Sequence, residues 1–303
     1  MQNKLSVSSD TQEVKFNEAP VRINEFQRFR RVFFGRPVVI VGFVVIFLLI
    51  ITAILAPIIA PYDPYQQDLK VAVQGSSFQH WLGTDQLGRD VLTRIIYGTR
   101  TSLEVGLIAV GVASIIGMSL GLMAGYFGGW FELIVMRIID AMMSIPNILL
   151  ALVFAAMLGG GLKNVMIAVG ISMVPSYCRL MRSQVLIVRQ TDYILAANVV
   201  GCSNLRVMFK HIFPNSLSPL IVLMSINLGG AIMAEAGLSF LGMGIAPPGA
   251  AWGSMVNDGY KYLLMNPVIS IAPGVCIMAV VLAFNMVGDG LRDALDPRLR
   301  GTI

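Results

Sequence analysis

The sequence predicts an all-α integral membrane protein with six transmembrane helices. Hydrophobic residues make up 56% of the 303 residues, charged residues make up only 13%, and the mean hydropathy is +0.74. Such a chain has too little polar surface to cover soluble domains. A helix that crosses a hydrocarbon core of about 30 Å needs about 20 apolar residues. Runs that approach or exceed this length with few charges occur six times, and each predicts a span.

The six predicted spans are residues 38–60, 105–127, 133–158, 162–178, 217–241 and 267–287. The first apolar run is longer than the core of a signal peptide, so we expect it to remain in the mature protein. The fourth is short before Arg179. Its helix therefore either begins directly after the 159–161 glycine turn or continues beyond the membrane surface.

The second span carries a strip of small residues at every fourth position: Ala113, Gly117, Gly121 and Gly125. Small residues let another helix backbone approach closely, so either a neighbouring span or a second subunit is expected to pack there. The first span lacks such a strip and is separated by the long segment 61–100. We therefore expect the first span to be peripheral to a bundle of the other five.

These observations divide the chain into four parts. Residues 1–37 form a tail, disordered up to about residue 20, in which Ile23, Phe26 and Val32 or Phe33 among arginines predict a helix lying in the membrane interface. Residues 38–100 hold the first span and the segment that follows it. Residues 101–290 form a core of five helices, with a polar loop at about 185–215, and residues 291–303 form a C-terminal tail.

The distribution of basic residues predicts the orientation of the chain, because basic loops are retained in the cytoplasm. With six spans, one side of the membrane holds 15 Lys and Arg residues and the opposite side holds 6. Both termini and the loop after the fourth span are therefore expected to be cytoplasmic. This bias accounts for the net charge of +5, and no nucleic-acid-binding motif accompanies it.

The loop from Asp192 to Asn215 is too polar to span a membrane and too apolar to be a flexible linker. Asp192 can cap a short helix through Ala196 and Ala197, and Gly201 can end that helix by adopting positive φ. Leu205, Met208 and Ile212 then give a second apolar face that Pro214 is expected to stop. The loop therefore predicts a short transverse helix flanked by turns.

This loop resembles the coupling loop of permeases from binding-protein-dependent ABC importers, which reads Glu-Ala-Ala-x-x-x-Gly and later Ile-x-Pro. The chain matches at Ala196, Ala197, Gly201, Ile212 and Pro214, and it has Leu195 where the family usually has Glu. The resemblance implies that these residues, with Asp192 and Tyr193, couple the chain to an ATPase.

Further motifs resemble the "C" subunits of dipeptide and oligopeptide permeases. They are Gly83-Thr-Asp-Gln-Leu-Gly-Arg-Asp90, Asp192-Tyr193, Glu235-Ala-Gly-Leu-Ser-Phe-Leu-Gly242, Pro247-Pro248, Trp252-Gly253 and Gly288-Asp-Gly-Leu-Arg-Asp-Ala-Leu-Asp-Pro297. The resemblance implies the type I ABC importer permease fold in a bacterial or archaeal inner membrane. It also implies a second related permease, two cytoplasmic ATPases that bind ATP and Mg²⁺, and an external solute-binding protein. The substrate it implies is di- or oligopeptides, although similar permeases serve glutathione, nickel chelates or opines.

Charged residues within the predicted spans suggest function by default, because they are costly in lipid. Arg137 and Asp140 are three residues apart and are expected to neutralise each other as a structural pair, with a gate as the alternative. Glu235 either hydrogen-bonds a neighbouring helix or faces the translocation path. In the segment 61–100, Asp85, Arg89 and Asp90 are predicted to take part in docking something outside.

The sequence argues against a catalytic role for this chain. It contains no phosphate-binding Gly-x-x-x-x-Gly-Lys-Ser/Thr loop, no His-Glu-x-x-His zinc helix and no Gly-x-Ser-x-Gly turn. Its three cysteines lack metal-ligand spacing, and its 18 methionines show no clustered ladder. We therefore expect a non-catalytic subunit with no cofactor or metal of its own. A non-transporting scaffold or receptor is the remaining alternative.

Overall fold

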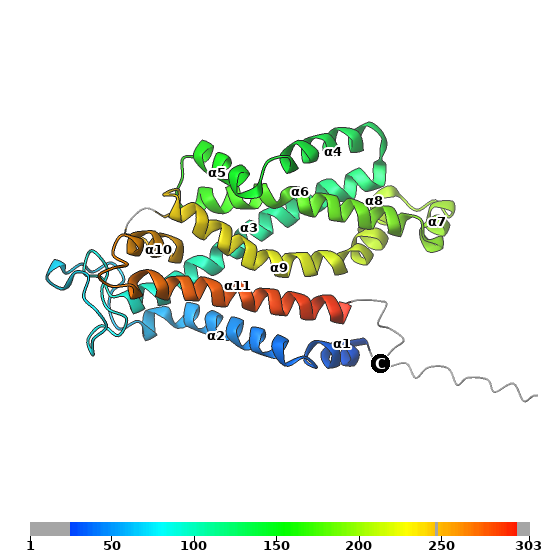
Figure 1. Ribbon diagram of the computed structural model, residues 1–303. Coiled ribbons are helices and arrows are strands. Elements are labelled where there is room, and N and C mark those ends of the chain that lie inside the picture. The colour runs from blue at the N-terminus through cyan, green and yellow to red at the C-terminus, as the bar shows by residue number, and fades with distance from the viewer. Residues whose placement is uncertain (1–24, 246–247, 296–303) are drawn as a thin grey trace, which may run out of the picture.

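The computed structural model describes residues 25–245 and 248–295, and these residues form a bundle of helices (Figure 1). The α-helices are α1 (Glu25–Phe33), α2 (Pro37–Ile59), α3 (Val91–Phe127), α4 (Gly129–Met143), α5 (Asn147–Leu158), α6 (Leu162–Arg189), α7 (Asp192–Val199), α8 (Asn204–Arg206), α9 (Phe213–Phe240), α10 (Trp252–Tyr260) and α11 (Val268–Leu295). A 3₁₀ turn, η1 (Leu69–Val71), and a π-helix, η2 (Val207–Ile212), complete the described elements.

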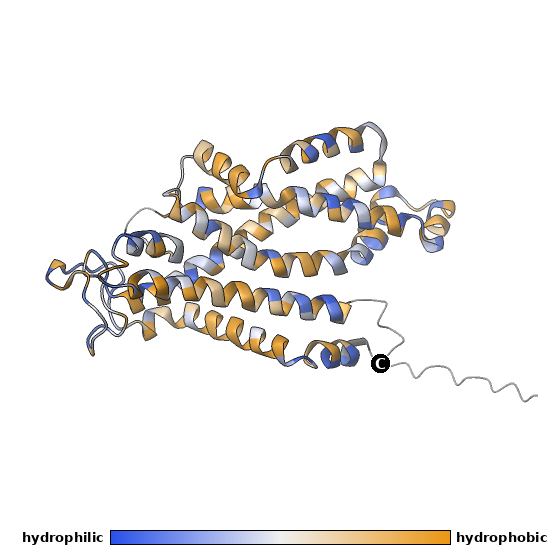
Figure 2. Ribbon diagram, in the orientation of Figure 1, coloured by the Kyte–Doolittle hydropathy of each residue, from blue (hydrophilic) through white to orange (hydrophobic). Residues whose placement is uncertain are grey.

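The bundle has two distinct ends. In Figure 1, α7, α8 and α1 lie at one end, which we call the α7 end, and residues 61–90 and α10 lie at the opposite end, which we call the α10 end. Figure 2 shows apolar residues concentrated along the helices between these ends, with hydrophilic residues gathered at both ends. This is the polarity profile of a chain that crosses a membrane along its long axis.

Within the described residues, five helical stretches are long and apolar enough to cross a membrane, and the bent pair α4 and α5 makes a sixth. The chain enters α4 at the α7 end and leaves α5 at the α10 end (Figure 1), so the pair makes one crossing. The prediction of six spans is confirmed.

The third span is broken into two helices next to Pro146. The axes of α4 and α5 differ by 99°. Pro146 disfavours a helical backbone at the residue before it and has no N–H to continue the ladder. The N–H of Ser144 closes α4 on Asp140 and Ala141, and α5 starts anew at Asn147.

The helices of the second and fourth spans extend beyond their apolar runs. The helix of the second span begins at Val91, where Asp90 caps it through Thr93 N, and not at residue 105. Its first turns hold Arg94, Arg100 and Glu104, which hid them from a search for apolar runs. The fourth span starts directly after the glycine turn and also continues to Arg189, so both alternatives for it are realised.

The small-residue strip of α3 is used within the chain. A Cβ added at Gly117 would lie 2.6 Å from the Cβ of Tyr177, and one added at Gly125 would lie 2.9 Å from the Cβ of Val185. Both neighbours belong to α6. Of the two candidates for this strip, the neighbouring span is therefore the one that packs on it.

The first span is peripheral, as predicted. Most of α2 is exposed, and its side chains pack on α11, where a Cβ at Gly42 would lie 2.8 Å from the Cβ of Met286. At the α7 end, the predicted interfacial helix is present as α1, and its Phe33 is buried against Val39 and Ala294. The predicted disorder of residues 1–20 lies outside the described residues, as does Ile23.

The last span extends into the predicted C-terminal tail. Helix α11 continues to Leu295, past the boundary drawn at residue 291. At this point Arg36 pairs with Asp293 at 2.6 Å and joins the start of α2 to the end of α11. The tail beyond Leu295 lies outside the described residues.

Candidate functional site

The predicted transverse helix is present as α7, between α6 and the α8–η2–α9 stretch. Its N-cap residue is Thr191, whose hydroxyl bonds the carbonyl of Val188, so the prediction that Asp192 caps the helix is wrong by one position. Asp192 occupies the first helical turn, where a carboxylate still favours the positive end of the helix dipole. One side chain of α7, Ile194, is completely buried and belongs to the main core cluster.

Gly201 ends α7 as predicted. Its φ is +81°, the left-handed region that favours glycine. The N–H of Cys202 bonds the carbonyl of Ala197 at 3.1 Å, and the N–H of Gly201 bonds that of Asn198 at 3.0 Å. These two bonds form a Schellman motif, which satisfies the last carbonyls of α7 and reverses the chain direction.

Pro214 does not stop the second helix of the loop, contrary to the prediction. Asn204 to Phe240 forms one continuous helical stretch, in which η2 ends at Ile212, two residues before Pro214. A proline ring collides with the carbonyl four residues earlier in an α-helix, and a π-turn widens the backbone at that point. Met208 and Ile212 are buried on the predicted apolar face, whereas Leu205 is exposed.

A polar clamp that the sequence analysis missed holds this loop against the bundle. The hydroxyl of Tyr126, near the end of α3, donates to Oδ1 of Asn204 at 2.9 Å. The guanidinium of Arg189, at the end of α6, donates to the carbonyl of Tyr126 at 2.9 Å and lies over the Tyr126 ring at 5.8 Å. These residues belong to three separate parts of the chain, so no local pattern could have joined them.

The outer face of the loop is apolar and exposed. Exposed apolar side chains on α7, its turn and the following helix are Tyr193, Leu195, Ala196, Val199, Val200, Leu205 and Phe209. Val199 is 88% exposed. We call this set the α7 surface. An apolar patch on a rigid element at a polar end of a protein is typical of a protein-protein contact. Leu195, at the position where the family usually has Glu, belongs to this surface, while Ala197 and Ile212 lie beneath it.

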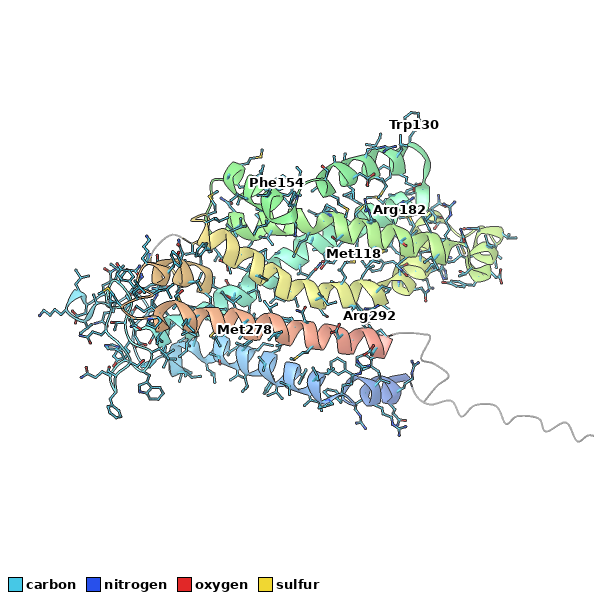
Figure 3. All side chains as sticks on the ribbon, in the orientation of Figure 1. Met118, Trp130, Phe154, Arg182, Met278 and Arg292 are labelled. Atoms are coloured by element: carbon cyan, nitrogen blue, oxygen red, sulfur yellow. The ribbon has the colours of Figure 1, made fainter. Side chains whose placement is uncertain are left out.

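The predicted pair of Arg137 with Asp140 does not form. Asp140 pairs with Arg179 of α6 at 2.6 Å, and Glu132 of α4 pairs with Arg182. Arg182 is labelled in Figure 3, on the side of the bundle where α4 lies. The side chains of α6 face α4 across the bundle surface, so they reach the carboxylates better than Arg137 does. No ion pair of Arg137 occurs among the described residues. The two interhelical pairs attach α4, which is otherwise mostly exposed, to α6.

Glu235 is fully buried, and its hydrogen-bond partner does not lie on a neighbouring helix, which was one of its two predicted alternatives. Its carboxylate accepts a hydrogen bond from the hydroxyl of Ser239, one turn further along α9 itself. Gly253 of α10 packs over this pair: a Cβ added there would lie 2.5 Å from Cα of Ala236 and 2.9 Å from Cβ of Ser239. The bond is therefore within one helix and is covered by α10.

The three predicted docking residues are interior. Asp85, Arg89 and Asp90 are at most 5% exposed. Asp85 accepts from Arg89 Nε at 2.7 Å, and Asp90 both caps α3 and lies 2.9 Å from Nδ1 of His80. Charged side chains in a loop satisfy the polar backbone that a compact turn would otherwise bury unpaired. These residues build the loop and do not present a docking surface.

In the parts of the chain that the structure describes, no cluster of three or more His, Cys, Asp or Glu side chains could hold a metal ion. The three cysteines are free thiols.

Two family models match the chain. Residues 117–301 match the binding-protein-dependent transport system inner membrane component, and residues 24–75 match the N-terminal transmembrane domain of oligopeptide transport permease C.

Several relatives are similar along most of their length. The dipeptide transport system permease protein DppC of Alkalihalophilus pseudofirmus is 46% identical over 261 residues, which cover 86% of each chain. The glutathione transport system permease protein GsiD of Pectobacterium atrosepticum is 42% identical over 276 residues, covering 91% of this chain and 92% of that protein.

Among solved structures, two crystal forms of the inward-facing MetNI methionine ABC transporter share the fold, with TM-scores of 0.55 and 0.56. Their sequence identity is 18% and 19%, and the alignments cover 67% and 68% of this chain and 96% and 97% of theirs. The chain belongs to the family of binding-protein-dependent transport system inner membrane components, and it is a multi-pass permease subunit of an ABC importer.

Proposed function

We propose that this chain forms, with a second related permease, the translocation path for di- and oligopeptides that an external solute-binding protein delivers. Two ATPase subunits bind ATP and Mg²⁺ and drive the cycle, while this chain hydrolyses nothing and binds no cofactor. The α7 end faces the cytoplasm in this proposal, with both termini on that side. The bias of 15 basic residues against 6 supports this orientation.

The observation that carries the proposal is the α7 surface. It exposes Tyr193, Ala196 and Val199 outward, while Ile194 holds the same helix in the core. Buried anchoring makes α7 a rigid projection, and an exposed apolar face gives an ATPase something to bind. The span α6 precedes α7, and the continuous helical stretch that contains α9 follows it. A displacement of α7 by the ATPase would therefore move both of these spans as rigid elements.

The substrate class rests on the relatives. One relative is named for dipeptide transport and another for glutathione, which is itself a tripeptide. Peptides are therefore the shared chemistry of these names. Nickel chelates and opines, which similar permeases serve, are the alternatives.

Docking at α7 is tested by co-purification of the ATPase subunits with the assembled complex. Ala196→Arg places a long charged side chain on the α7 surface, where the methyl group is exposed, and we expect it to release the ATPase subunits. The matched control is Leu264→Arg, on an apolar residue that is also exposed but lies at the α10 end. Equal ATPase recovery from both variants and the wild type would mean that the ATPase subunits do not dock at the α7 surface.

The substrate is tested by isolating the binding protein with its endogenous ligand and identifying that ligand by mass spectrometry. A peptide, including glutathione, supports the proposal. A nickel chelate or an opine in the binding site would replace the substrate class while leaving the permease assignment intact.

A further inference from the structure

Arg94 connects two segments that are remote in sequence. Its side chain is 2% exposed, and it lies in the first turn of α3. Its Nη1 donates to the carbonyls of Pro64 at 3.1 Å and Pro248 at 3.2 Å, and its Nη2 donates to that of Gly249 at 3.0 Å. Pro64 belongs to the 61–90 loop, whereas Pro248 and Gly249 belong to the turn that leads from α9 to α10.

The planar guanidinium is suited to this geometry. Its five donors are fixed in one plane, so carbonyls bound to both terminal nitrogens are held in a defined relation to one another. Its nearest carboxylate oxygen, Oδ2 of Asp85, is 3.5 Å from Nε. A buried cation satisfied mainly by neutral carbonyls contributes little as an ion pair, and its evident role is to fix those backbones in place.

Further contacts join the same parts. The indole N–H of Trp252 donates to the carbonyl of Ile95 at 3.0 Å, and the hydroxyl of Thr101 donates to that of Ala250 at 3.0 Å. On the other side of the loop, Asn266 Nδ2 donates to the carbonyl of Gln74 at 2.8 Å. These hydrogen bonds therefore connect three parts of the chain into one body: the first turns of α3, the 248–251 turn with the start of α10, and the 61–90 loop.

This body is also attached to α9. Gly253 of α10 packs directly on Ala236 and Ser239, as described above. The opposite end of α9 is continuous with the stretch that follows α7. A packed route therefore runs from the α7 surface along α9 to α10, and from there through Arg94 to the 61–90 loop.

We infer that Arg94 is a positioning residue for transport: it holds the 61–90 loop on the 248–251 turn, so that movement of α9 and movement of the loop are coupled. The inference rests on the proposed function, in which a solute-binding protein approaches the α10 end. Its consequence is that docking of the loaded binding protein changes the rate of ATP hydrolysis by the ATPase subunits, and that this effect depends on Arg94.

The test uses the complete complex, with both permeases, both ATPases and the binding protein, reconstituted in lipid nanodiscs. The readout is the ratio of ATP hydrolysis with loaded binding protein to hydrolysis without it. Arg94→Lys keeps the positive charge but removes the planar guanidinium that binds several carbonyls at once. We expect the ratio of ATP hydrolysis with loaded binding protein to hydrolysis without it to fall by about 5-fold or more, which is the lower end of a typical coupling between two sites.

The matched control is Arg89→Lys. Arg89 is also 2% exposed and also lies beside Asp85, but its side-chain hydrogen bond, to Asp85, stays within its own loop. We expect its ratio to remain near that of the wild type. An equal loss in both variants would mean that Arg94 only stabilises the loop, and an unchanged ratio in Arg94→Lys would likewise overturn the inference.

A milder variant decides the matter if Arg94→Lys does not assemble. Thr101→Val removes one bond to the 248–251 turn while keeping the side-chain shape, and a lost bond of about 1 kcal/mol corresponds to roughly a 5-fold change. We expect its ratio to fall in the same direction, and a wild-type ratio there would refute the inference. Failure of the ATPases to co-purify with the wild type would instead refute the proposed function.

Discussion

The attachment of α7 to the bundle depends on one side chain, and this gives a prediction with a defined size. Ile194 is completely buried, whereas Val199 on the same helix is 88% exposed. Ile194→Ala removes buried methyl and methylene groups and leaves a cavity, which costs about 2–5 kcal/mol in protein cores. Alanine has a better helix propensity than isoleucine, but this stabilises the variant by less than about 0.7 kcal/mol, so the cost of the cavity dominates.

This cost falls on a local equilibrium. Helix α7 contacts the rest of the chain through α6 and η2, and Ile194 is its only fully buried residue. Each 1.4 kcal/mol changes an equilibrium constant tenfold, so we expect opening of α7 to rise by about 30-fold to 5,000-fold. The remaining spans do not depend on Ile194, and their unfolding should change much less.

Amide hydrogen exchange of residues 195–200 in the purified complex measures this opening. Val199→Ala is the matched control, because it shortens an aliphatic side chain on the outward face. It should leave exchange within about 0.5 kcal/mol of the wild type and weaken ATPase binding instead. Unchanged exchange in Ile194→Ala, or equally fast exchange in both variants, would refute the view that one buried residue holds a helix whose outer face binds the motor.

Two glycines and one buried carboxylate give three further predictions. Gly201→Ala should destabilise the folded position of α7 by about 1–2 kcal/mol through its left-handed backbone alone, because a Cβ there meets nothing within 4 Å. Hydrogen exchange of the α7 amides measures this loss. Gly242→Ala, which also has positive φ but lies at the end of α9, should leave exchange in α7 unchanged. Gly121→Ala should destabilise the α3–α6 contact by about 1–3 kcal/mol, which thermal unfolding measures. Its control is Gly111→Ala, which faces open space and should be neutral or slightly stabilising. Equal melting temperatures of the two variants would argue against a close contact between α3 and α6. Glu235→Gln keeps an acceptor for its helical neighbour, so complex abundance and peptide uptake should both stay close to the wild type, and loss of uptake at normal abundance would place Glu235 on the path.

The positions of the spans could be predicted because hydropathy is a local property of the chain. The same holds for Gly201, whose positive φ follows from the turn that its own sequence demands. A proline such as Pro146 disfavours a continuous helix by local rules, but the 99° angle at this break depends on how α4 and α5 pack on α6, which no local rule contains. Pro214 shows the opposite case, because the π-turn before it absorbs a clash that local rules treat as a helix stop.

The candidate site was predicted less completely than the fold. Ala196, Ala197 and Gly201 were proposed as coupling residues because the loop resembles that of a known family, but the anchor Ile194 and the clamp at Tyr126 were not predicted. A single isoleucine in a short helix gives no periodicity, so its burial is visible only once α7 is placed against α6. Tyr126, Arg189 and Asn204 come from three elements, and only their packing brings them within hydrogen-bond distance.

The sequence by itself determined the membrane class, the number of crossings and the identity of the transverse loop, since each depends on composition and on spacing within a few turns. Tertiary structure alone decided which charges meet. Asp140 pairs with Arg179 and not with its neighbour Arg137, and Asp85 and Arg89 turn inward. The physical reason is that the partner of a charge depends on helix rotation and on distances between segments far apart in the chain, which the order of residues does not state.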